Sequence, residues 1–176
     1  MMLLRHLLAI ALLPFIVTVL IPMWVARRNG VRFAAAPTAP ELIAQFGGLC
    51  LVLIGLVLFL SSLRRFAGDG KGTLAPWDPP RQLVVTGPYR FVRNPMISGV
   101  LFVLFGEALI LLSRPQLTWA LIFLLINAMY IPLLEEPQLR GRFGAAYDEY
   151  CDHVPRLVPR LRPWTPGGPG GARTTG

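Results

Sequence analysis

Four long stretches of the chain carry almost no charged side chains. They cover residues 7–26, 42–63, 96–112 and 117–134. A helix rises about 1.5 Å per residue, so each stretch is close to the length needed to cross a hydrocarbon layer of about 30 Å. The pattern predicts an all-α fold, a polytopic membrane protein with four transmembrane helices.

The connections between these runs refine the prediction. Only Ser113-Arg114-Pro115-Gln116 separates the last two runs, and so short a connection predicts an antiparallel helical hairpin. The first run has a competing interpretation as a signal peptide, because Arg5 precedes an apolar stretch. Its length and the lack of a small-residue cleavage site favour a transmembrane helix.

Composition supports a membrane protein and argues against several other classes. Hydrophobic residues make up 54% of the chain and charged residues 15%, whereas soluble domains carry about 25% charged residues. The net charge of +8 would suggest nucleic acid in a soluble chain. Here the basic residues flank apolar runs, so we expect membrane lipids as partners and no nucleic acid. The two cysteines and two histidines show neither a disulfide framework nor metal-ligand spacing.

The distribution of arginine predicts the orientation. Most basic residues lie between the second and third runs or after the fourth. The positive-inside rule makes both segments cytoplasmic, with the N- and C-termini on that side, although Arg27, Arg28 and Arg32 then lie outside. Sixteen of the seventeen basic residues are arginine, which indicates a GC-rich, bacterial genome and hence an inner membrane.

The first polar segment, residues 70–97, is too rich in proline and glycine for a helix. Pro95 suits the first turn of the third apolar helix, so the start of that helix presents free N–H groups. With Arg90 and Arg93 beside it, this start predicts a site for a carboxylate or phosphate. The alternative is that the arginines anchor in headgroups and Asn94-Pro95 only begins a helix.

The second polar segment, residues 135–159, begins with two adjacent carboxylates, Glu135 and Glu136. Two such groups at a membrane boundary are better tolerated beside a cation, either an arginine or a ligand ammonium or sulfonium. Four residues then recur at steps of four, four and three: Leu139, Phe143, Tyr147 and Tyr150. They predict one apolar-aromatic face of an interfacial helix, which caps a site or has no catalytic part.

Glu107 is an acidic residue inside the third apolar run. Carboxylates within a membrane are functional candidates by default. It lies roughly 16 Å along the helix from Met96, so we expect it to face a cavity or to pair with Arg114.

The ordered motifs resemble a known superfamily. They are Gly87-Pro88-Tyr89-Arg90-Phe91-Val92-Arg93-Asn94-Pro95-Met96, a helical hairpin, Glu135-Glu136, the spaced Leu139, Phe143-Gly144, Tyr147 and Tyr150, and Val154-Pro155-Arg156. Together they resemble the isoprenylcysteine carboxyl methyltransferase and phospholipid methyltransferase superfamily of integral membrane enzymes. The resemblance covers about half of the chain, roughly residues 70–159. It implies an S-adenosylmethionine-dependent methyltransferase whose lipophilic substrate enters from the bilayer.

The chemistry of this cofactor suits both polar segments. Its carboxylate fits the helix start with Arg93, and its cationic groups fit the acidic pair. The expected catalytic residues are Arg93 and Glu136. The expected cofactor-binding residues are Tyr89, Arg90, Arg93, Asn94, Pro95, Met96, Glu135, Glu136, Tyr147 and Tyr150.

Two positions depart from the common family pattern. Asn94 stands where histidine is usual, and Ile97 where tyrosine is common. We expect cofactor binding to persist, but acid–base chemistry by an imidazole does not transfer to this chain. The methyl acceptor stays open among a carboxylate, a phospholipid amine, a lipid alcohol and a thiol.

Two other functions compete with methyl transfer. Sterol reductases, which use NADPH, resemble the same C-terminal half. A non-enzymatic membrane protein that retains the fold is the second alternative. The sequence predicts one domain over residues 1–162 and a disordered tail over 163–176, which has almost nothing to bury.

Overall fold

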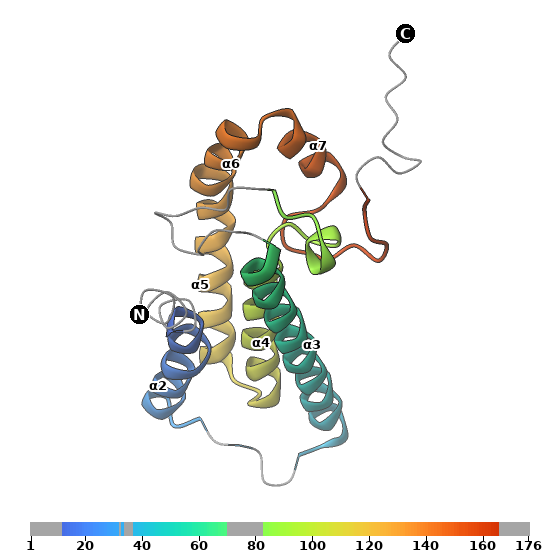
Figure 1. Ribbon diagram of the computed structural model, residues 1–176. Coiled ribbons are helices and arrows are strands. Elements are labelled where there is room, and N and C mark those ends of the chain that lie inside the picture. The colour runs from blue at the N-terminus through green and yellow to red at the C-terminus, as the bar shows by residue number, and fades with distance from the viewer. Residues whose placement is uncertain (1–11, 32, 34–36, 70–82, 166–176) are drawn as a thin grey trace.

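The computed structural model describes residues 12–31, 33, 37–69 and 83–165, and within them all regular structure is helical. The all-α prediction is confirmed. The elements (Figure 1) are α2 (Ile21–Arg28), α3 (Ala39–Asp69), α4 (Pro95–Ile110), α5 (Arg114–Tyr130), α6 (Glu136–Phe143) and α7 (Ala145–His153). Residues 12–15 and a π-helical turn at Ile16–Leu20 lead directly into α2.

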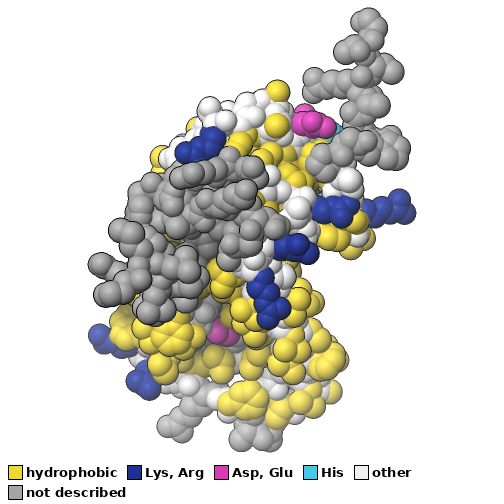
Figure 2. All heavy atoms as spheres, viewed as in Figure 1, with side chains coloured by type: hydrophobic (Ala, Val, Ile, Leu, Met, Phe, Trp, Pro, Cys, Tyr) yellow, Lys and Arg dark blue, Asp and Glu magenta, His cyan; other side chains and the backbone are white. Residues whose placement is uncertain are grey.

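Among the residues that the structure describes, two helices are long and apolar enough to cross a membrane. They are Ala39–Arg65, with a mean hydropathy of 2.5, and Arg114–Phe143, with 2.0. α4 is shorter than predicted, at 16 residues, and residues 7–11 of the first run lie outside the described part of the chain. Large apolar side chains on α3 face outward, for example Ile43 (74% exposed). A bilayer would cover such a surface, which marks a membrane protein, and Figure 2 shows hydrophobic side chains over much of the lower face.

Close contact between α3 and α4 depends on four glycines. A Cβ added to Gly48 would lie 2.6 Å from the carbonyl oxygen of Gly106, and one added to Gly55 would lie 2.6 Å from that of Gly99. The residue pairs run in opposite directions along the two helices, so the helices are antiparallel. Because glycine has no side chain, the two backbones approach more closely than they could with any other residue at these positions.

The first helix consists of residues 12–15, the π-helical turn and α2. Side chains of α5 hold it in place by donating hydrogen bonds to its backbone. Trp119 Nε1 donates to the Val17 carbonyl at 3.1 Å, and Gln116 Nε2 donates to the Pro22 carbonyl at 2.7 Å. Val17 also packs with Val100 of α4 in one buried cluster. These bonds satisfy polar groups that would otherwise be costly to bury.

The prediction of a separate interfacial helix that carries all four spaced residues is wrong. The helix of α5 continues through a π-helical turn, Ile131–Glu135, into α6 without a break, although its apolar run ends at Leu134. The break comes at Gly144, whose φ of +53° suits glycine alone. The predicted aromatic face is therefore divided between α6 and α7, whose side chains still share one cluster.

The C-terminal segment, residues 154–165, returns to the residues that precede α4. Arg93 N donates to the Pro155 carbonyl at 2.8 Å, and Trp164 N donates to the Arg90 carbonyl at 2.9 Å. Trp164 is 8% exposed and packs on Tyr150. The predicted tail boundary at residue 163 is thus wrong, because Trp164 has an aromatic cluster to bury against. Residues 166–176 lie outside the described part.

The glycine contact predicts different effects for two neighbouring substitutions. We expect Gly48→Ala to lower the free energy of unfolding by about 1–3 kcal/mol, because its Cβ forces α3 from α4. Gly47→Ala is the control, since its Cβ would meet nothing within 4 Å, and it should be neutral or slightly stabilising. Thermal unfolding in detergent, followed by circular dichroism, measures both. Equal destabilisation would contradict the close contact.

Removal of the Trp164 ring should destabilise the C-terminal segment. We expect Trp164→Ala to cost about 3–5 kcal/mol, as for other buried aromatic residues. Leu161→Ala is the matched control in the same segment, because Leu161 is 98% exposed, and it should leave the melting temperature unchanged. An unchanged melting temperature for Trp164→Ala would show that the segment does not contribute to the fold.

Candidate functional site

The polar segments meet at one end of the helices. There, α6 and α7, the residues before α4 and the C-terminal segment lie together beyond the apolar parts of α3 and α5 (Figure 1). The sequence predicted that the two polar segments would share one side. The structure brings residues 83–97 and 135–159 together, whereas residues 70–82 lie outside the described residues.

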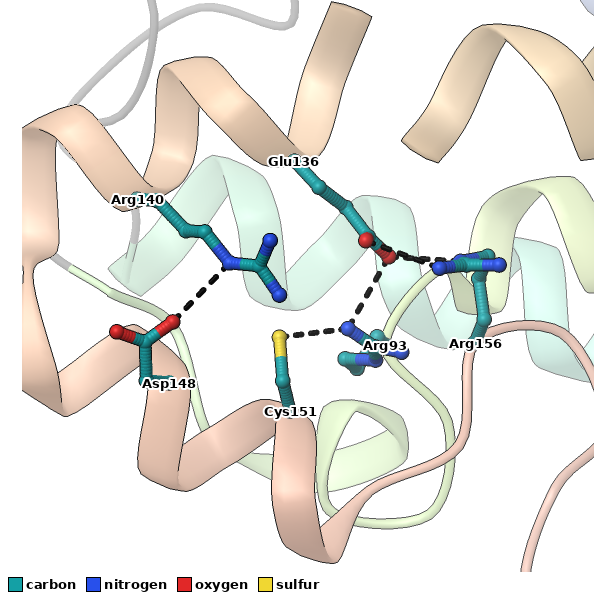
Figure 3. A network of polar contacts seen from close by, with 6 residues as sticks. All are labelled: Arg93, Glu136, Arg140, Asp148, Cys151 and Arg156. Carbon is teal, nitrogen blue, oxygen red and sulfur yellow. Dashed lines mark hydrogen bonds and ion pairs between the residues drawn. The ribbon is translucent and has the colours of Figure 1, made fainter. Parts of the chain in front are cut away.

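Glu136 is the centre of this region. Its carboxylate is 5% exposed and accepts bonds from Arg156 Nε to Oε1 at 2.7 Å and from Arg156 Nη2 to Oε2 at 2.9 Å. Arg93 Nη1 lies 3.1 Å from Oε1 on the other side (Figure 3). We call these three residues the Glu136 junction. Two guanidinium groups on one buried carboxylate satisfy both of its oxygens.

The π-helical turn before α6 sets the direction of Glu136. Pro132 has no N–H group to continue the α-helical bonding, and the N–H of Glu136 donates to the Ile131 carbonyl five residues earlier. The extra residue in this turn rotates all following side chains by about 100° relative to an uninterrupted α-helix. Glu136 is thereby buried in the junction, while Glu135 stays half-buried beside it.

The charges around Glu136 keep it ionised. Burial alone would raise the pKa of its carboxyl, but the Arg156 hydrogen bonds and the charge of Arg93 outweigh burial and lower that pKa below the ordinary value of 4.5. The same hydrogen bonds raise the pKa of Arg156. Glu136 therefore acts as a fixed anion that holds two arginines, and it is a weak base.

Arg93 retains unused bonding capacity. Its Nη1 contacts both Glu136 and the sulfur of Cys151, the latter at 2.6 Å. Its Nε is buried and finds no hydrogen-bond partner among the residues that the structure describes. A buried donor without a partner is costly, so this atom suits an acceptor oxygen of a ligand.

Three tyrosines surround the junction and stay protonated. Tyr150 OH donates to the Tyr89 carbonyl at 2.6 Å. Burial raises the pKa of Tyr89, Tyr147 and Tyr150, and the charge of Glu135 adds to the effect on Tyr89. These hydroxyls are thus hydrogen-bond donors and not bases near neutral pH.

Glu135 differs from its neighbour in its surroundings. Burial, followed by the negative charge of Glu136, raises the pKa of the Glu135 carboxyl. A carboxyl with a raised pKa gains most from a cation or a donor placed next to it. Of the predicted acidic pair, Glu135 is therefore the member with the greater need of a cationic ligand.

Several predicted residues have structural tasks. Arg90 Nε donates to the Trp164 carbonyl at 2.7 Å, and its Nη2 contacts the hydroxyl of Thr165. The backbone N–H groups of Arg93 and Asn94 donate to the carbonyls of Pro155 and Arg156. The predicted anion site at the start of α4 therefore lacks these two N–H groups, because the C-terminal segment uses them.

The site prediction did not include Arg156 or Cys151. Arg156 is part of the Glu136 junction, and Cys151 contacts its Arg93. Arg156 ends the Val154-Pro155-Arg156 motif, so a signal existed, but its sequence distance of 20 residues from Glu136 did not reveal the pairing. Cys151 carried no signal, since a single cysteine follows no ligand spacing.

Comparisons with known proteins relate much of the chain, including Arg93, Glu135 and Glu136, to a known family. The family model for phospholipid methyltransferases matches residues 43–146, more than half of the chain. Methanethiol S-methyltransferase 2 of Bradyrhizobium diazoefficiens is 38% identical over 77 residues, which are 42% of this chain and 27% of the relative. The chain therefore spans about a quarter of that relative's length. No solved structure matches the chain.

Loss of the Glu136 charge should destabilise the fold itself. We expect Glu136→Gln to cost about 3–5 kcal/mol, because two arginines then face each other without a counter-charge. Glu135→Gln is the adjacent control and should change stability little, since it removes a repulsion. The measurement is thermal unfolding in detergent without ligand. Equal effects of the two substitutions would contradict the division of roles.

The pH dependence follows from the lowered pKa of Glu136. The stability that this ion pair provides is fully present above the ordinary carboxyl pKa of 4.5 and is lost as the pH falls through the lower folded-state pKa. The melting temperature of Glu136→Gln should therefore differ from that of the wild type at neutral pH and approach it in acid.

Proposed function

The chain belongs to the phospholipid methyltransferase family, and from this premise we propose that it is an S-adenosylmethionine-dependent methyltransferase. The observation that carries the proposal is the family match over residues 43–146, which contains Arg93, Glu135 and Glu136. The sequence resemblance to this superfamily is thereby confirmed. No feature of the described residues favours the NADPH-dependent alternative.

The residues of the site fit such a cofactor. The free Nε of Arg93 suits a carboxylate, and Arg156, whose side chain is 36% exposed, adds a second positive charge on the accessible side. Glu135 suits an ammonium group, because its carboxyl lacks the two arginines that occupy Glu136. We therefore assign cofactor binding to Arg93, Arg156 and Glu135, and a positioning role to Glu136.

The bound cofactor would supply a methyl group on a positively charged sulfur, which is already activated for transfer. The protein's part is to orient the reactants and exclude water. Glu136 fixes the two guanidinium groups, and the cluster of Tyr147, Tyr150 and Trp164 covers the site with apolar surface. This assignment replaces the direct catalytic role expected for Glu136 with an indirect one.

The acceptor that we propose is a thiol or an amine of a small or lipophilic molecule. The relative's name specifies methanethiol, and the family's description specifies phospholipids. Both kinds of acceptor lose a proton before or during transfer. Tyr89 is held protonated by burial and Glu136 is a weak base, so neither side chain is suited to receive that proton.

The surrounding membrane completes the proposal. We propose four spans, with α4 and α5 as a hairpin and the Glu136 junction on the cytoplasmic side of a bacterial inner membrane. The basic residues in and around the Glu136 junction support this orientation by the positive-inside rule. The exposed apolar faces of α3 and α5 support lateral entry of a lipophilic substrate from the bilayer.

Cofactor binding gives the direct test. S-adenosylhomocysteine should raise the melting temperature of the detergent-solubilised chain by mass action, and NADPH should not. Glu135→Gln should weaken that binding by at least about tenfold, equivalent to about 1.4 kcal/mol, with stability unchanged in the ligand-free protein. Stabilisation by NADPH alone would favour a reductase, and no response to either ligand would favour a non-enzymatic protein.

Radiolabelled methyl transfer then separates the acceptors. Methanethiol and phosphatidylethanolamine should each be tested as the methyl acceptor, with the wild type and with Glu135→Gln. A thiol acceptor predicts volatile product, whereas an amine acceptor predicts label in the lipid fraction. Transfer at the wild-type rate by Glu135→Gln would contradict the role of Glu135 in cofactor binding.

A further inference from the structure

A second polar position lies in α4, remote from the Glu136 junction. Glu107 is twelve residues beyond Pro95, or about 18 Å along the helix axis. It lines a pocket of about 330 Å³ between the first helix, α4 and α5. Other residues that line this pocket, here called the Glu107 pocket, include Thr18, Met23, Ala26, Ile110, Leu111 and Gln116.

The Glu107 carboxyl, which lines this pocket, has one unused oxygen. Oε2 is buried and has no hydrogen-bond partner within the described ranges 12–31, 33, 37–69 and 83–165. The neighbouring polar side chains do not compete for it, because Thr18 donates to the Pro14 carbonyl at 2.7 Å and Gln116 donates to the Pro22 carbonyl at 2.7 Å. The predicted alternative of a pair with Arg114 is not found, since the ion pairs among the described residues do not include one between Glu107 and Arg114.

A carboxyl in apolar surroundings requires compensation. An isolated charge in a membrane-spanning helix costs several kcal/mol unless it is neutralised or paired. A proton removes the charge but leaves an oxygen without a donor. An ammonium group brings both the opposite charge and three N–H donors.

We propose that the Glu107 pocket binds an aliphatic amine. The ammonium lies against the Glu107 carboxylate, and the alkyl chain packs on Met23, Ile110 and Leu111. The pocket volume is near the lower end of the range for ligand sites, about 300–1,000 Å³, so a short chain fits. The amine belongs either to a small free molecule or to an aminophospholipid headgroup, which share this chemistry. The proposal does not depend on the proposed methyl transfer.

The test uses the full chain in a detergent that lacks amines. Thermal unfolding is measured with hexylamine, and with hexanol and hexanoate as neutral and anionic molecules of the same chain length. We expect hexylamine alone to raise the melting temperature in a concentration-dependent way. Glu107→Gln should weaken the apparent affinity by at least about tenfold, equivalent to about 1.4 kcal/mol.

Two further variants keep the result decisive. Ala26→Leu fills the pocket but retains the carboxylate, so it should also weaken binding, and it decides the matter if Glu107→Gln does not fold. Glu135→Gln, in the remote site, should leave the hexylamine effect unchanged. The proposal is overturned by equal stabilisation with hexanol, by an effect that persists in both pocket variants, by an effect lost in Glu135→Gln, or by no effect.

Nanodiscs distinguish the two sources of the amine. Hexylamine binding is compared in bilayers with and without phosphatidylethanolamine. Competition by this lipid identifies a headgroup as the occupant, and binding that the lipid leaves unchanged identifies a free amine.

Discussion

The carboxylate of Glu136, held between two arginines, is the interaction on which the functional end of this protein depends. Arg93 precedes α4, Glu136 begins α6, and Arg156 follows α7. One buried anion therefore joins three segments that are distant in the chain. Removal of the anion leaves two cations close together, and the largely buried one, Arg93, then has no counter-charge, which costs more than the loss of a surface ion pair.

The two adjacent glutamates have different roles because the helix changes its geometry immediately before them. In the π-helical turn at Pro132, one extra residue turns Glu136 into the junction and leaves Glu135 at its side. Neighbouring residues of the same type thereby meet opposite environments: one carboxylate is saturated by arginines, whereas the other has a raised pKa beside Tyr89. Local backbone geometry thus separates a structural carboxylate from one that is suited to a ligand.

The helices α3 and α4, which support the functional end, touch most closely where both carry glycine. Gly48 and Gly55 of α3 lie against Gly106 and Gly99 of α4. In a bilayer, apolar side chains gain little from leaving lipid, so close backbone packing takes over part of the role of the hydrophobic effect. This packing fixes the start of α4, and with it the position of Arg93. The Glu107 pocket lies along the same helix, where the first helix and not α3 forms the opposite wall.

The sequence determined much of the fold. Long apolar runs predict helices because a bilayer leaves each backbone group no partner except its own helix, and the motif from Gly87 to Met96 with Glu135-Glu136 indicated the family that the comparison then matched. The seven-residue spacing of Gly48 with Gly55 and of Gly99 with Gly106 was also present in the sequence, but it did not by itself reveal which helices would meet.

Only the tertiary structure decided how the site is assembled. The pairing of Arg156 with Glu136, the burial of Trp164 and the contact of Cys151 with Arg93 all join segments that no local pattern relates. The division of the predicted aromatic helix at Gly144 likewise left no mark in the spacing of its apolar residues. Periodicity reports which residues share a face of a local element, whereas the partner of a buried charge depends on where distant segments return in space.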